Sequence, residues 1–414
     1  MRIERLGDLG AAADVLRALA HSAERLSLPP PAALIGEWFG SGAVIAPSVE
    51  IRPVEPAAAF DTASGSGGDA VGGGWIGYLS YPEPGADDAP PRIPVAAGGW
   101  TDCVLRLDDG GCWWFESLAG QPMPSWVSTA LTTPPATAGW TIDWKGPDTQ
   151  RHRDGVLSCL AAIRAGEIYQ ACVCTQFTGT LTGSALEFFA DGVARTAPAR
   201  AAYLAGRWGA VASLSPELFV RRTGERVDSS PIKGTLPVHD DPDRLRSSAK
   251  DVAENIMIVD LVRNDLGHVA RTGSVTVPEL LAVRRAPGVW HLVSTVSARV
   301  PGDLPMPVLL DATFPPASVT GTPKTRARQL LSQWEPFRRG AYCGTVGMVS
   351  PLAGAELNVA IRTVEFDADG RAVLGVGGGI TADSDPDAEW QECLDKAAPI
   401  VGSAQVSRAR STAS

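Results

Sequence analysis

The order of helix-like and strand-like segments constrains the fold of this chain more than any other feature. Apolar residues recur at helical spacing over 152–165 and 244–269, whereas strand-like runs follow one another at 341–350, 355–366 and 372–376. A parallel sheet would need a helix between almost every pair of successive strands, and that alternation is missing. The pattern therefore predicts an α+β fold with large antiparallel sheets flanked by helices.

Two parts of the chain differ in composition and in the regularity of their apolar patterns. Residues 1–145 are rich in Ala, Pro, Gly and Trp and contain only short strand-like runs, whereas later patterns are more regular. A chain of 414 residues can form one large domain or two ordinary ones. We predict a single intertwined domain, with 1–145 as its more divergent half, 146–406 as its functional region and 407–414 as a disordered tail.

Composition excludes several classes of function. The formal net charge is −10 and no block of Lys and Arg is present, which argues against nucleic acid and anionic membranes as partners. The seven cysteines form no Cys-x-x-Cys pair, and the five histidines lack zinc-ligand spacing. Neither a secretory leader nor an apolar run of about 18 residues is found. The sequence therefore predicts a cytoplasmic protein with reduced thiols.

Lys233 stands in an unusual setting for a lysine. It lies between Ile232 and Gly234 in the stretch Ser-Pro-Ile-Lys-Gly-Thr-Leu-Pro, where a tight segment can aim its amine. Glu217 ends a similar turn, Ser-Pro-Glu, sixteen residues earlier. The two side chains are a nucleophile and a proton donor, which are the groups needed to displace a poor leaving group such as hydroxide. For Lys233 alone, the alternative is a solvated surface lysine.

Two acidic pairs share one helical spacing. Asp251 and Glu254 are three residues apart in the first, Glu389 and Glu392 in the second, and Lys396 continues the second face. The second pair belongs to a helix predicted over 387–401, with Asp385 as N-cap and Pro386 in its first turn. Solvated helix faces are one interpretation. A site for Mg²⁺ is the other, since this ion prefers oxygen ligands.

Several further residues are candidates for binding an anion. The bare backbone of Gly377, Gly378 and Gly379 would let such a ligand approach closely. Neither these glycines nor the stretch 320–325 fits a nucleotide-binding template, because the required glycine spacing is missing in both.

Arg362, Tyr342 and His291 are expected on strands. Arg362 and Tyr342 have donors suited to a carboxylate, with a surface arginine and a core tyrosine as the alternatives. His291, in the strand predicted over 289–300, has a core histidine as its alternative.

Taken in order, these segments resemble those of the chorismate-utilising enzymes over about 150–405. The matching motifs are Glu167-Ile-Tyr-Gln170, Ser215-Pro-Glu217, Pro231-Ile-Lys-Gly-Thr235, the stretch from Asp251 to Asp265, the stretch from Phe314 to Lys324, Gly340-Ala-Tyr-Cys-Gly344, Ile361-Arg-Thr363, and Gly377-Gly-Gly-Ile380 ahead of Asp383-Ser-Asp-Pro386. The segment 72–81 matches the first half of the family more loosely. Two departures are Pro316 and Leu236, where the family usually has glycine and arginine.

Two positions distinguish the branches of the family. Relatives that hydroxylate chorismate use a lysine to activate water where this chain has Gln170. Anthranilate synthases typically have alanine where this chain has Lys233. The resemblance thus implies amination at C4, which gives 4-amino-4-deoxychorismate on the route to 4-aminobenzoate and folate, with Lys233 as nucleophile and Glu217 as general acid.

The resemblance also implies how substrate and metal are held. Mg²⁺ would be bound by Glu254 and Glu392, with Asp251 and Glu389 close by, and would receive the ring carboxylate. The remaining assignments are Arg362 and Tyr342 to the enolpyruvyl carboxylate, Lys396 and the backbone of Gly377, Gly378 and Gly379 to an anionic group, and Thr322 and His291 to the ring.

The ammonia would come from a partner. No cysteine of this chain lies in a glycine-framed turn like that of a glutaminase, so the resemblance implies a separate glutamine amidotransferase subunit. Anthranilate synthase component I, which aminates at C2 and releases pyruvate, is the nearest alternative. A hydroxylating relative and a non-catalytic protein that binds chorismate or tryptophan are the others.

Overall fold

Two large antiparallel sheets form the centre of the molecule. The computed structural model describes residues 1–83, 90–133 and 138–402, and every strand pairing within these ranges is antiparallel. The α+β prediction is therefore confirmed. The tail predicted at 407–414 lies outside the described residues.

The first sheet has twelve strands. Their order is β1 (Arg2–Gly7), β8 (Trp113–Ser117), β7 (Cys103–Leu107), β3 (Ser41–Ala46), β2 (Ala32–Trp38), β11 (Arg200–Gly206), β12 (Gly209–Ser215), β21 (Thr363–Asp367), β22 (Arg371–Ile380), β10 (Gln170–Gly183) and β18 (Gly321–Thr322), with β9 (Trp140–Lys145) paired to β10.

The second sheet has ten strands. Their order is β15 (Ile232–Pro237), β17 (Val289–Arg299), β14 (Arg226–Ser230), β13 (Leu218–Thr223), β20 (Gly354–Asn358), β19 (Thr345–Ser350), β5 (Gly74–Leu79), β6 (Ala96–Thr101) and β4 (Arg52–Pro53), with β16 (Thr276–Ala286) paired to β17. Strands from both sides of residue 145 enter both sheets, so the two halves are intertwined as predicted.

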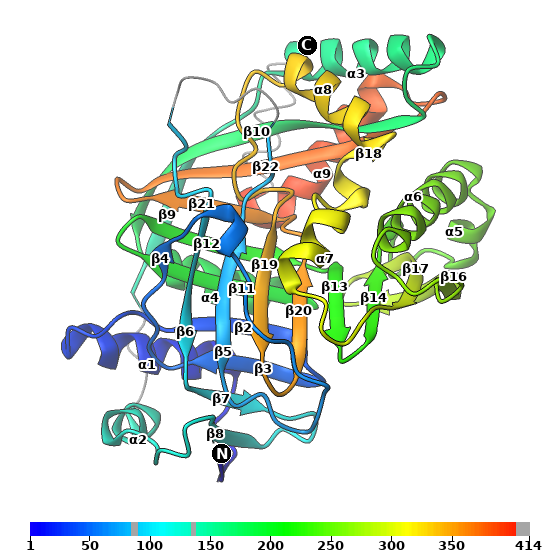
Figure 1. Cartoon of the computed structure of the whole chain (residues 1–414). Helices are drawn as coiled ribbons and strands as arrows, with labels where there is room; N and C mark the ends of the chain where they lie inside the picture. Colours follow the sequence, from blue (N-terminus) through cyan, green and yellow to red (C-terminus); the bar gives the residue numbers. More distant parts are fainter. Residues whose placement is uncertain (84–89, 134–137, 403–414) are drawn as a thin grey trace.

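Helices cover the outer faces of the two sheets (Figure 1). Their bounds are α1 (Ala12–Arg25), α2 (Ser125–Thr132), α3 (Thr149–Arg164), α4 (Ala185–Thr196), α5 (Asp243–Ser247), α6 (Ala249–Gly267), α7 (Met306–Thr313), α8 (Lys324–Trp334) and α9 (Pro386–Val401), with short 3-10 turns η1 (Pro56–Ala58) and η2 (Ala317–Val319). No helix in the described ranges is long and apolar enough to span a membrane.

The apolar residues of β2 show how the layers form. Leu34 belongs to a buried cluster shared with Ile76 and Met348 of the second sheet, whereas its neighbour Ile35 belongs to a cluster with Leu16 of α1. Because successive side chains of a strand point to opposite faces, a sheet covered on both sides needs apolar residues at every position. A third cluster joins the second sheet to α6 and α7. These layers leave the site described below between α6 and α9.

Two predicted segments are divided in the structure, and a third is shorter than predicted. The helix predicted over 244–269 is wrong as one element, because Ser248 adopts an extended conformation, ends α5 and caps α6 by accepting a hydrogen bond from the Asp251 N–H. The strand predicted over 355–366 divides into β20 and β21, and the one predicted over 341–350 begins only at Thr345. The helix predicted at 387–401 is confirmed, including the Asp385 cap.

Candidate active site

A cavity of about 300 Å³ lies between α6 and α9 and contains most of the predicted site residues. Its walls come from the glycine-rich end of β22, from β15 and β17, and from η2. Its size suits a small organic ligand. All the predicted residues line it except Gln170, Thr322 and Glu389.

Lys233 points into this cavity from β15. Its Nζ donates a hydrogen bond to the Ser318 carbonyl oxygen (3.1 Å) and lies 3.8 Å from Glu254 Oε2. The strand bulges between Ile232 and Thr235, and Gly234 has a φ of +84°, a conformation that glycine adopts without strain. With only 11% of its side chain exposed, Lys233 is not the solvated surface lysine of the alternative interpretation.

Glu217 is held in the turn between β12 and β13. The Ser215 hydroxyl donates to the Val359 carbonyl oxygen (2.6 Å) and accepts from the Glu217 N–H (3.1 Å), which fixes the turn. The residue is 3% exposed. Burial raises the pKa of Glu217 to about 7, against the opposing effects of a hydrogen bond to Ser318 and the charge of Lys233. A carboxyl group with such a pKa keeps a proton near neutrality, as a general acid requires.

Ser318 links these two groups, although sequence reasoning did not single it out. Its carbonyl oxygen accepts from Lys233 and its side chain hydrogen-bonds Glu217. It lies in the middle of η2, so the backbone of this 3-10 turn sets where both groups meet the cavity. Its sequence signal was the ordered stretch Pro-Pro-Ala-Ser-Val-Thr-Gly.

His291 lines the cavity as an uncharged side chain. Burial lowers its pKa to about 4, and the charge of Arg362 adds to this effect. The Nδ1 atom shares a hydrogen bond with Thr235 Oγ1 (2.8 Å), so Nε2 takes the complementary role of donor or acceptor. Thr235 is a second residue that sequence reasoning missed.

Arg362 and Tyr342 reach the cavity from loops, which corrects their predicted placement on strands. Arg362 has a φ of +50° between β20 and β21. Among the described residues no ion pair or hydrogen bond satisfies its guanidinium, which therefore suits an anionic ligand. Tyr342 is buried in the turn before β19, and its ring packs so close to Gly375 that a Cβ there would lie 2.2 Å from Tyr342 Cδ1.

Gln170 and Thr322 face each other across the pairing of β10 with β18. Both are largely removed from solvent, and neither Gln170 Oε1 nor Thr322 Oγ1 has a hydrogen-bond partner among the described residues. Gln170 Oε1 would lie 3.7 Å from a Cβ at Gly379, so it lies directly behind the glycine wall. The two polar atoms are thus available to a ligand or to water.

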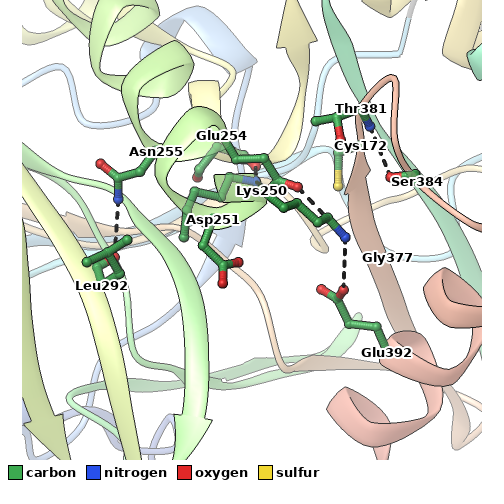
Figure 2. A network of polar contacts seen from close by, with 12 residues as sticks. Cys172, Lys250, Asp251, Glu254, Asn255, Leu292, Gly377, Thr381, Ser384 and Glu392 are labelled. Carbon is green, nitrogen blue, oxygen red and sulfur yellow. Dashed lines mark hydrogen bonds and ion pairs between the residues drawn. The ribbon is translucent and has the colours of Figure 1, made fainter. Parts of the chain in front are cut away.

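The two acidic pairs converge from different helices. Glu254 of α6 and Glu389 and Glu392 of α9 each have a carboxylate oxygen within 4.0 Å of the Nζ atom of Lys250. Figure 2 shows this lysine with Glu254, Glu392 and the nearby Asp251. Lys396 donates to Glu392 Oε1 and to the Gly377 carbonyl oxygen, both at 2.7 Å. Sequence reasoning missed Lys250, although its spacing of four residues from Glu254 was a signal for an ion pair.

These carboxylate oxygens are the type of ligand that a hard divalent cation prefers. Within the described ranges no group of three or more His, Cys, Asp or Glu side chains is arranged as a ready metal cluster, and Lys250 lies between the three glutamates. However, Glu389 is 1% exposed and its Oε2 has no hydrogen-bond partner in the described structure. A buried carboxylate oxygen without a partner is costly, and such oxygens are the ligands that Mg²⁺ prefers.

Comparisons with known proteins identify relatives of this chain. The family model described as chorismate binding enzyme matches residues 50–402. "Aminodeoxychorismate synthase component 1" of Escherichia coli is 39% identical over 281 residues, which cover 66% of this chain and 62% of that protein. The protein of the same name from Klebsiella aerogenes is 37% identical over 342 residues, which cover 78% of this chain and 75% of that protein.

A solved structure shares the fold over nearly the whole chain. The crystal structure of anthranilate synthase component I from Streptococcus pneumoniae TIGR4 superposes with a TM-score of 0.69 at 22% identity, covering 97% of this chain and 92% of that one. The chain spans less than two thirds of the length of the E. coli relative. The family itself is shown by the match over most of the sequence: this chain belongs to the chorismate binding enzymes.

Proposed function

We propose that this chain aminates chorismate at C4 to give 4-amino-4-deoxychorismate. The observation that carries the proposal is the pairing of the Lys233 amine and the Glu217 carboxyl group in one cavity, both held by Ser318. The names of the relatives from Escherichia coli and Klebsiella aerogenes support the same activity. The cavity lies within the region 146–406 expected to carry catalysis, since its lining residues run from Cys172 to Lys396.

The reaction proceeds in two displacements. In the first, Lys233 Nζ forms a bond to C2, the ring double bonds shift, and the C4–O bond breaks while Glu217 gives its proton to the departing hydroxide. In the second, ammonia forms a bond to C4 and the C2–N bond breaks, which releases Lys233 as the amine. The new C4 ammonium returns a proton to Glu217, so the sum is chorismate and ammonia converted to product and water.

The remaining residues bind and orient the substrate. Arg362 and Tyr342 hold the enolpyruvyl carboxylate and His291 lines the ring, whereas Thr322 is not among the residues that line the cavity. Lys396 and the backbone of the glycines assist at an anionic group, while Gln170 stands where hydroxylating relatives activate water. Mg²⁺, held by Glu254 and Glu392 with Asp251 and Glu389 close by, would neutralise the ring carboxylate.

The proposal includes a partner and a compartment. The relatives are named as component 1, and no cysteine of this chain lies in a glycine-framed turn like that of a glutaminase. A separate glutamine amidotransferase therefore supplies ammonia, in the cytoplasm, where thiols stay reduced. The alternative, anthranilate synthesis by C2 amination with loss of pyruvate, has a relative named "Anthranilate synthase component 1 1" from Haloarcula marismortui, 37% identical over 256 residues.

Consumption of chorismate tests the proposal. Purified protein with chorismate and MgCl₂ at pH 8.5 is expected to consume chorismate only after an ammonium salt is added, and to stop when EDTA removes the metal. Consumption at the same rate without ammonium would mean that water is the nucleophile, and would contradict the proposal.

A methyl group at Gly379 is expected to slow amination about tenfold. The Cβ of Gly379→Ala would lie 3.2 Å from both Lys233 Nζ and Glu254 Oε2, so the nucleophile must shift by a few tenths of an ångström. A displacement of 1 Å costs roughly 100-fold in rate. The matched control is Gly302→Ala, whose Cβ meets only Glu225 at 3.8 Å. Equal rates in both variants would show that Lys233 tolerates displacement.

A further inference from the structure

The amine of Lys250 lies between carboxylates from two different helices. Its Nζ is 2.7 Å from Glu389 Oε1, 4.0 Å from Glu254 Oε1 and 4.0 Å from Glu392 Oε2. Figure 2 shows the side chain extending from α6 toward Glu392 of α9. One flexible cation thus bridges the two helices that form opposite walls of the cavity.

Lys250 differs from the other two lysines of this region in what holds it. Lys233 also donates to the Ser318 carbonyl, and Lys396 also donates to the Gly377 carbonyl. Within the described structure, the ammonium of Lys250 is held by carboxylates alone. The positive charge of Lys250 therefore balances the acidic cluster. In the described structure, only these carboxylates hold the ammonium group in place.

The ammonium group satisfies this cluster only in part. It makes one hydrogen bond, to Glu389, and leaves Glu389 Oε2 without a partner. A divalent cation carries twice the charge, and Mg²⁺ binds one or two carboxylates together with water molecules. The same oxygens cannot surround the ammonium and a metal ion together, because both cations would occupy the space between the three glutamates.

We infer that Lys250 is an internal counter-ion that occupies the metal position when no metal is bound, and that Mg²⁺ binds by displacing it. This inference rests on the proposed function only for the identity of the metal. Lys250 lies in the first turn of α6 and its side chain is 38% exposed, so rotation of its four-carbon stem carries the amine into solvent without movement of the helix. Lys250 therefore sets the affinity of the site for metal.

Lysine labelling tests the displacement in the unmodified protein. The five lysines are Lys145, Lys233, Lys250, Lys324 and Lys396. With an amine-acylating reagent and mass-spectrometric readout, labelling of Lys250 is expected to rise at least fivefold between EDTA and saturating MgCl₂, while exposed Lys145 stays constant as internal reference. Unchanged or reduced labelling of Lys250 in MgCl₂ would overturn the inference.

Calorimetric titration of two variants gives an independent measurement. Lys250→Met removes the competing cation, so its Kd for Mg²⁺ is expected to fall at least tenfold below that of the wild type and of the control Lys145→Met. In EDTA its melting temperature is expected to be lower than that of the control, with a larger gain on adding MgCl₂. Equal Kd values for both variants would overturn the inference.

Failure of the inference about Lys250 can be distinguished from failure of the proposed function, because neither measurement uses chorismate or ammonia. A protein that releases Lys250 to Mg²⁺ yet aminates nothing would overturn the proposed function and support the inference. A protein that aminates chorismate while Lys250 stays protected from labelling in MgCl₂ would support the proposed function and overturn the inference.

Discussion

The Lys233→Ala protein is expected to lose amination of chorismate by a factor of about 10³ or more. Without the amine no covalent bond to C2 forms, and ammonia would have to displace hydroxide directly. Chorismate binding should change little, because the groups assigned to the carboxylates, Arg362 and Tyr342, remain in the cavity. The rate is measured with ammonium as nitrogen source, and binding by calorimetry.

Lys145→Ala is the matched control, since Lys145 is an exposed residue of β9. It should keep the wild-type rate. If Lys233→Ala also forms product at that rate, the covalent step does not occur. If it loses chorismate binding and rate together, Lys233 serves binding and the two-displacement mechanism is wrong.

Glu217→Gln is expected to lower activity and raise stability at the same time. Glutamine keeps the shape and the acceptor oxygen but cannot protonate the leaving hydroxide, which costs about 10²- to 10⁴-fold in rate. Near-complete burial raises the pKa of Glu217 from 4.5 to about 7, so ionising this group in the folded protein is unfavourable. The variant does not ionise there and avoids that cost.

The sign of the stability change follows from proton binding. Between pH 5 and 7 the folded wild type holds a proton that the unfolded chain has lost, so wild-type stability falls as the pH rises through this window. The loss reaches about 3 kcal/mol above pH 7. Urea unfolding should therefore show Glu217→Gln more stable than wild type at pH 8, with a difference that shrinks toward pH 5. A variant less stable than wild type at pH 8 would contradict the raised pKa.

Local sequence signals predicted the parts of the fold that depend on neighbouring residues. Asp385 and Pro386 mark the start of α9 because capping needs only the first turn of the helix. The Ser-Pro-Glu turn was found for the same reason, since Ser215 satisfies the N–H of Glu217 two residues later. Such interactions are contained within a few residues, so a single sequence reveals them.

Features that depend on distant packing were not predictable in the same way. The break at Ser248 was missed for a different reason: its cap of α6 is as local as that of Asp385, but the apolar pattern continues on both sides of it. Arg362 was predicted on a strand, yet its φ of +50° places it in a turn. This turn packs against β12, where the Leu214 N–H donates a hydrogen bond to the Arg362 carbonyl oxygen. Ser318 forms a hydrogen bond with Glu217, and Lys250 forms one with Glu389. In each pair the two residues lie about 100 residues or more apart in the sequence.

The product of the reaction tests the central claim most directly. Purified protein is incubated with chorismate, MgCl₂ and an ammonium salt at alkaline pH, and the product mass is measured while anthranilate fluorescence is followed. The account predicts a product with the mass of aminodeoxychorismate, with its enolpyruvyl group retained and without fluorescence. Fluorescent anthranilate together with released pyruvate would contradict it, and would assign this chain to C2 amination despite Lys233.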